Sequence, residues 1–110
     1  GGVRTFGHSA CFKESTILSD SLKVKDDEIY IIGGFYPTEM RTTPEGAKHL
    51  DGTKSSILSF NIRTNSWKHK GHLKNPREFH TSVLCDNTRV FVFGGYHIGE
   101  FWERGEIVYI

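Results

Sequence analysis

The sequence predicts an all-β protein assembled from two copies of one strand-rich unit. The main observation is a string that occurs twice, as residues 28–36 and again as residues 89–96. Each copy is a run of β-branched and aromatic residues that ends in two glycines and an aromatic residue. Such residues favour strands, and their near-continuous apolarity predicts a strand covered on both faces. Two copies within 110 residues indicate a repeat architecture.

A second landmark recurs in the same order ahead of each copy. Arg77-Glu78-Phe79-His80 precedes the second copy, and Arg4-Thr5-Phe6-Gly7-His8 precedes the first. Both contain an arginine, a phenylalanine and a histidine, followed by a small hydroxylic residue and an apolar stretch. Aligning them by type makes Gly7 one extra residue in the first copy. Two landmarks in one order support the repeat more strongly than either does alone.

Alternation and turn residues place the expected strands. Leu58, Phe60 and Ile62 alternate along one face, and residues 63–66 form a polar turn into a short polar strand. The only helical signal is one turn at Glu45–His49 within a loop. The expected strands, in order, are Phe6–Lys13, Glu28–Gly33, Ser55–Ile62, Ser66–Lys70, Phe79–Cys85, Arg89–Gly94 and Glu106–Ile110.

Composition limits the class of protein. The chain is long enough for one domain, with 36% hydrophobic, 13% aromatic and 25% charged residues. A net charge of +1 gives no reason to expect nucleic acid or an anionic membrane as a partner. No apolar run approaches the roughly 18 residues that span a bilayer. Cys11 and Cys85 are too few for a disulfide scaffold, so we expect reduced thiols and an intracellular, cytoplasmic protein.

Four strands per unit, with an apolar second strand and a polar fourth strand, are typical of a β-propeller blade. The chain resembles the kelch-repeat family in its two glycine pairs, its Arg-Phe-His entries and the segment Phe60-Asn61…Asn65-x-Trp67. This resemblance implies a kelch-type propeller with four-stranded antiparallel blades. The chain then holds about 1.75 blades, a full one over residues 3–71 and an incomplete one over residues 72–110. The structural repeat markers are Gly33, Gly34, Gly94, Gly95, Trp67, Arg77 and His80.

The glycine pairs lie 61 residues apart, and kelch units have about 50. Insertions are therefore expected in residues 35–54 and between the first two strands. Propellers close with about four to eight blades. The chain is therefore expected to be a piece of a larger protein, whose open faces require further blades or self-association.

The loops indicate where a partner would bind. Successive loops of an up-and-down sheet alternate between its two ends, so residues 35–54, 71–76 and 99–104 are expected to share one end. Binding residues concentrate on loops held by a rigid scaffold, and an exposed tryptophan beside arginine is typical of binding hot spots. The candidate residues are Arg41, Glu45, Lys48, His49, Asp51, Lys54, His97, Glu100, Phe101, Trp102 and Arg104.

Other polar residues are expected to be structural. Arg4 and Arg77 are predicted to bond backbone carbonyls between blades, and His8 and His80 to play one packing role in each blade. His69 and His72 are expected to point to opposite sides of a strand end. Without nearby cysteine they would hold no metal, and we predict neither a metal nor another cofactor.

The predicted function is protein–protein interaction. Kelch resemblance implies an adaptor, for instance one that delivers substrates to a ubiquitin ligase or binds the cytoskeleton. No catalytic motif is present, so no catalytic residue is predicted. Two alternatives remain: a small-ligand or sugar-processing propeller enzyme, and a unit that completes a closed structure while its own loops bind nothing.

Overall fold

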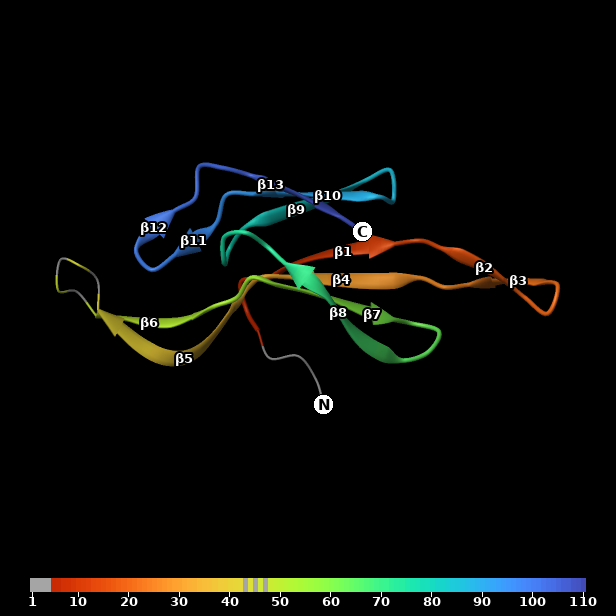
Figure 1. Ribbon diagram of the computed structural model, residues 1–110, viewed down its shortest axis with the longest axis horizontal. Coiled ribbons are helices and arrows are strands. Elements are labelled where there is room, and N and C mark those ends of the chain that lie inside the picture. Colours follow the sequence, from red (N-terminus) through yellow and green to blue (C-terminus); the bar gives the residue numbers. More distant parts are fainter. Residues whose placement is uncertain (1–4, 43, 45, 47) are drawn as a thin grey trace.

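The computed structural model describes residues 5–42, 44, 46 and 48–110, and in this part of the chain every regular element is a β-strand (Figure 1). Arg4 and Glu45 lie outside the described residues. Within the described part, no helix has the length and apolarity that crossing a bilayer requires.

Two antiparallel sheets form the body of the molecule. The first sheet has the strand order β1 (Ser9–Lys13), β4 (Glu28–Ile32), β7 (Ser56–Asn61) and β8 (Ser66–His72). The second sheet has the order β9 (Thr81–Cys85), β10 (Arg89–Phe93) and β13 (Glu106–Tyr109). Neither sheet closes on itself. The expected all-β class is confirmed, as are the expected strands, with small differences at their ends.

Three further hairpins fill the long connections. They are β2 (Thr16–Ser19) with β3 (Leu22–Lys25), β5 (Phe35–Thr42) with β6 (Lys48–Thr53), and β11 (Tyr96–His97) with β12 (Glu100–Phe101). The tip of β2–β3 has positive φ at both Asp20 and Ser21, as a type I′ hairpin turn requires. The helical turn expected at Glu45–His49 is wrong at its described end, because Lys48 and His49 belong to β6 and pair with β5.

The core lies between the two sheets. Cys11, Tyr30, Ile32 and Ile57 of the first sheet are buried together with Val90 and Val92 of the second. Leu84, Val108 and Ile110 pack against this cluster. Burial raises the pKa of the Tyr30 hydroxyl to about 12. Burying this apolar surface is the main force that holds the sheets together.

The two units match in a different register from the one expected. Phe6 forms a bridge with Phe35, and Glu78 forms the equivalent bridge with Tyr96. The next residues, Gly7 and Phe79, both have positive φ (66° and 54°), so Gly7 is not an extra residue. Glycine adopts this conformation freely, whereas Phe79 must be held there by its surroundings. The alignment of Phe6 with Phe79 was therefore wrong.

This register gives the repeat its residue correspondences. His8 corresponds to His80, and Ser9 to Thr81, since Ser9 pairs with Ile32 and Thr81 pairs with Phe93. Both pairs lie just before a glycine pair. Arg77 then corresponds to Thr5, so the two arginines of the sequence pattern are not equivalent.

Candidate partner-binding site

The expected loops do lie at one end of the sheets. Hairpins β5–β6 and β11–β12 extend from the left of Figure 1, and hairpin β2–β3 extends from the opposite end. We call the end with β5–β6, β11–β12 and residues 73–80 the loop face. Backbone hydrogen bonds join its segments: the Lys54 N–H donates to Gly34 and the Arg77 N–H donates to Lys54. The loop face is thus fixed to both sheets.

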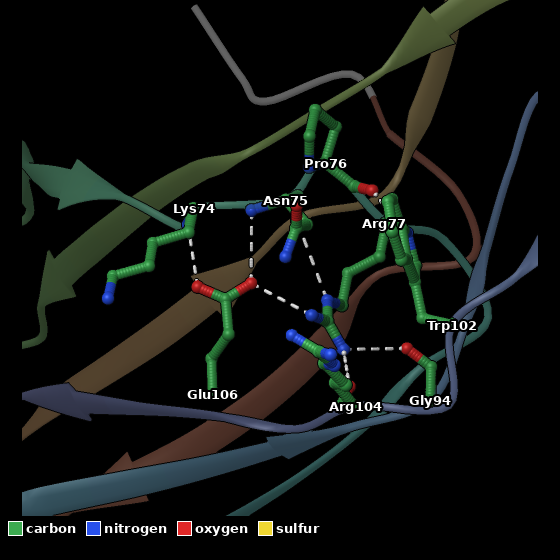
Figure 2. A network of polar contacts seen from close by, with 8 residues as sticks. All are labelled: Lys74, Asn75, Pro76, Arg77, Gly94, Trp102, Arg104 and Glu106. Carbon is green, nitrogen blue, oxygen red and sulfur yellow. Dashed lines mark hydrogen bonds and ion pairs between the residues drawn. The ribbon is translucent and has the colours of Figure 1, made fainter.

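A buried arginine organises the loop face (Figure 2). The Arg77 side chain is 0% exposed, and its Nη1 donates to the carbonyls of Gly94 (2.8 Å) and Arg104 (2.9 Å). Its Nη2 lies 2.8 Å from Oε2 of Glu106. The same carboxylate accepts hydrogen bonds from the backbone N–H groups of Lys74 and Asn75. The buried charge is therefore both neutralised and hydrogen-bonded.

Arg77 does bond backbone carbonyls, but not between the two sheets. Gly94 and Arg104 both belong to the connection between β10 and β13. The network therefore joins the segment that enters the second sheet to the loop of that same sheet. Arg4, expected to act in the same way, lies outside the described residues.

Trp102 is anchored rather than exposed, which corrects the expected hot spot. Its side chain is partly buried, and its Nε1 donates to the carbonyl of Pro76 at 2.8 Å. The Arg77 guanidinium lies 5.9 Å from the centre of the Trp102 ring, and the His97 ring stacks on Trp102 at 6.4 Å. The arginine beside the tryptophan is thus buried Arg77. Trp102 fixes the loop, and other side chains form its surface.

The exposed part of the loop face is aromatic and basic. Phe101 is 80% exposed and rests edge-on against Tyr96, with ring centres 5.3 Å apart. Lys74 and Arg104 are exposed at a shallow cavity of about 460 Å³. Among the described residues neither cation is part of an ion pair. The cavity is lined by Lys74, Asn75, Arg104, Gly105, Glu106 and Ile107.

Of the remaining candidates, Glu100 pairs with His97 on β11–β12, and the described others lie on or next to β5–β6. Arg41 pairs with His49, and Lys48 pairs with Thr42, on the backbone of β5–β6. The ammonium of Lys54 lies 5.9 Å from the centre of the Tyr36 ring. The structure therefore brings His97, Glu100, Phe101, Trp102 and Arg104 together in the β10–β13 connection, where Trp102 and the Arg104 carbonyl contact Arg77. Lys54 follows β6, so it and the β5–β6 residues belong to a separate hairpin segment.

Sequence reasoning missed Lys74, Asn75 and Glu106. The sequence pattern predicts Glu106 only as the first residue of a strand. A carboxylate that opens an otherwise apolar strand, Glu106-Ile107-Val108-Tyr109, is the one signal that points to a buried partner.

The first glycine pair allows close packing between the sheets. A Cβ at Gly33 would lie 2.6 Å from the Arg77 carbonyl oxygen and 2.8 Å from Cε1 of His80. The next residue, Gly34, donates its N–H to that same carbonyl at 2.9 Å. Trp67 lies on the other side of the first sheet, where its ring is 4.9 Å from that of Phe60. Gly33 is therefore required by the neighbouring sheet, whereas a Cβ at Gly34 would meet Thr5, His8 and Phe6 of its own unit.

His80 bridges the two sheets. Its Nε2 lies 2.8 Å from Oγ of Ser9, and burial lowers the pKa of His80, with the Arg77 charge acting in the same direction. This is also the separation of a nucleophile and its base. However, no carboxylate of the described residues accepts a hydrogen bond from the other ring nitrogen. The contact therefore explains packing better than catalysis.

His69 and His72 share one side of the strand, contrary to expectation. Their ring centres are 4.6 Å apart. The pairing of β7 with β8 contains a bulge: Ile57 pairs with Gly71, and the next residue, Leu58, pairs with His69. Lys70 therefore has no partner in the pairing, and the alternation of side chains along β8 shifts by one residue. Nδ1 of His72 lies 3.2 Å from Oγ of Ser55. In the described part of the chain, no group of three potential ligands is placed to hold a metal.

Comparison with known proteins does not assign the chain to a family. No protein-family model matches this sequence, and a search of curated proteins finds none similar to it.

Proposed function

We propose that the chain is part of a kelch-type β-propeller whose loop face binds a partner protein. The four-stranded antiparallel order β1-β4-β7-β8 supports the fold, because it is the meander of a propeller blade. The face-to-face packing of the second sheet on the first is consistent with successive blades. The glycine pairs add support, since all four glycines have positive φ and Gly33, Gly34 and Gly95 lie close to residues of the strand-entry segments.

The observation that carries the binding proposal is the exposed rim of the loop face. Lys74 and Arg104 line a shallow cavity, and exposed Phe101 lies on the same loop as Arg104. Buried Arg77 and anchored Trp102 hold the backbone of this loop. An exposed aromatic group on a rigid loop binds at low entropic cost. The two cations favour a partner segment that carries a carboxylate beside an apolar residue. An adaptor that recognises a short acidic segment of another protein fits this chemistry.

The test is comparative affinity capture with the full chain. Immobilised wild type is compared with the double variant Phe101→Ser and Arg104→Glu, and recovered proteins are quantified by mass spectrometry. The control carries Leu18→Ser and Lys23→Glu on the β2–β3 hairpin, where both side chains are also exposed. We expect at least one protein to be recovered by wild type and control and to fall more than about tenfold with the loop-face variant. Equal recovery by all three would overturn the proposal.

A deletion of residues 38–53 then separates the two hairpins of the loop face. If the partner binds the rim around Phe101, recovery persists without β5–β6. If recovery is lost only in the deletion, the binding site lies on β5–β6 and not around the cavity.

A further inference from the structure

Two sheet surfaces of this chain are apolar and uncovered. On each sheet, the uncovered surface consists of the side chains that alternate with the buried ones and so face away from the core. Phe12 is 48% exposed, Val83 is 52% exposed and Phe93 is 50% exposed. The first-sheet outer face consists of Ala10, Phe12, Ile29, Ile31, Leu58 and Phe60. The second-sheet open face consists of Val83, Phe91, Phe93 and Ile107.

Each uncovered face is the repeat counterpart of a covered one. In the register set by His8 and His80, buried Cys11 of the first sheet corresponds to exposed Val83 of the second. Likewise, exposed Phe12 corresponds to Leu84, which packs on the core. The second-sheet open face therefore matches the surface that already holds a neighbour. The first-sheet outer face corresponds to the core-facing side of the second sheet, which is the side that packs on the first sheet.

The polar contacts of the covered junction also have counterparts. Ser9 bonds His80 across the junction, and the corresponding residues are Thr81 and His8, again a hydroxyl and an imidazole. Both are exposed in this chain. Cys11 meets Ser82 in the covered junction, at 3.1 Å. The counterparts Val83 and Ala10 would form a purely apolar contact.

The glycine pair of the second unit has room for the same contact. A Cβ at Gly94 would have only the Trp102 carbonyl oxygen within 4 Å, at 3.9 Å, whereas Gly33 is closed off by Arg77 and His80. The Gly95 N–H has no backbone acceptor among the described residues, whereas the Gly34 N–H donates across the junction. By correspondence, the Thr5 carbonyl of a neighbour would accept from Gly95, and its His8 ring would cover Gly94.

We propose that copies of this chain associate head to tail, with the second-sheet open face of one copy covered by the first-sheet outer face of the next. A second copy carries the apolar surface, the imidazole and the carbonyl that the open junction lacks. A net charge of +1 opposes such association only weakly. Because the two faces differ, the interface is heterologous and produces a ring or a filament rather than a twofold dimer.

The test uses the full chain in analytical ultracentrifugation with two face variants. Wild type should sediment as multiples of 12.5 kDa. Val83→Glu on one face and Phe12→Glu on the other should each weaken association on the order of 100-fold, because each would bury an unpaired carboxylate. The control Leu18→Glu, at a side chain 75% exposed on β2–β3, should associate like wild type.

Mixing the two face variants distinguishes head-to-tail association from other modes. Each variant retains one intact face, and the two intact faces are complementary. An equimolar mixture of Val83→Glu and Phe12→Glu should therefore form a one-to-one dimer that neither variant forms alone. Three results would each overturn the proposal. They are a wild type that is monomeric at about 100 µM, a Phe12→Glu or Val83→Glu variant that self-associates like wild type, and a mixture of the two variants that stays monomeric. The concentration of about 100 µM is well above the dissociation constants of stable oligomers.

A glycine substitution gives a second, milder test. Asparagine tolerates positive φ, so Gly94→Asn adds a side chain to the open junction with little strain in the monomer. Gly46→Asn is the matched control, since Gly46 also has positive φ and nothing within 4 Å of a Cβ. Association should weaken at least about tenfold in Gly94→Asn alone. Equal association of both variants would contradict the proposed contact.

Discussion

At the scale of single residues, Arg77 decides how the loop face is built. Arginine can be buried here because its rigid guanidinium presents several donors, and the Gly94 and Arg104 carbonyls and the Glu106 carboxylate accept from it. Breaking a buried ion pair is costly, although replacing both partners by apolar residues is often tolerated. The arrangement therefore predicts a large single-variant effect and a smaller double-variant effect.

Arg77→Met should lower the free energy of unfolding by about 3–5 kcal/mol, since it leaves Glu106 buried without its cation. The double variant Arg77→Met with Glu106→Leu should recover part of that loss. Chemical denaturation monitored by circular dichroism measures both. A loss below about 1 kcal/mol in the single variant would place Arg77 in a solvated position instead.

His80 makes the junction between the sheets sensitive to pH. Its pKa is lowered by burial, so the folded state favours the neutral ring. The stabilisation is therefore complete above the unfolded-state pKa of about 6.5 and is lost as the pH falls through the lower folded-state value. Burial raises the pKa of Glu78, which acts in the opposite direction as the pH falls.

We expect the unfolding free energy of wild type to decrease from about pH 7 to about pH 5 more steeply than that of His80→Gln. Both proteins are compared in the same buffer at each pH. Glutamine keeps a polar partner for Ser9 but does not titrate. Denaturation curves at several pH values provide the measurement. Parallel pH dependences in the two proteins would show that His80 titrates as an exposed histidine does.

At the scale of elements, the long strands of both sheets followed from the sequence, and the hairpins did not. Continuous apolar runs such as residues 28–32 have few alternatives to a buried strand. The tip of β2–β3 instead contains Asp20-Ser21, which lacks the glycine that usually marks a primed turn. Pro37 similarly obscured strand β5, which has a register shift there.

The loop face was predicted as a location but not in its detail. Alternation of loops between the ends of a sheet correctly placed β5–β6 and β11–β12 together. The role of Trp102 was not predictable, because its acceptor, the Pro76 carbonyl, lies 26 residues away in the chain. Long-range contacts of this kind depend on how loops pack, and local sequence patterns carry no information about them.

The glycine pairs provide a matched comparison between covered and open junctions. Gly33 and Gly94 have nearly the same φ, 62° and 65°, so Gly33→Ala and Gly94→Ala introduce the same backbone strain. Only at Gly33 would the new methyl group lie 2.6 Å from the Arg77 carbonyl. In the monomeric Val83→Glu background, we expect Gly33→Ala to lose at least about 1–2 kcal/mol more stability than Gly94→Ala in thermal unfolding. Equal losses would mean that the two junctions do not differ.

At the scale of the whole molecule, the chain is an elongated body of 62 × 30 × 16 Å with one covered junction and two uncovered faces (Figure 1). The covered junction contains the buried core, the His80 contact and the Gly34 hydrogen bond. We propose that the same contact that joins the two sheets within one copy also joins the second sheet of that copy to the first sheet of the next copy.

Amide hydrogen exchange measured by NMR at Gly34 and Gly95 tests this claim most directly. In monomeric Val83→Glu, the Gly34 N–H should be protected, because it donates to the Arg77 carbonyl across the junction, and the Gly95 N–H should exchange rapidly. In associated wild type, both amides should be protected. Rapid exchange at Gly34 in the folded monomer would contradict the account, as would a Gly95 amide that exchanges equally fast in the monomer and the assembly.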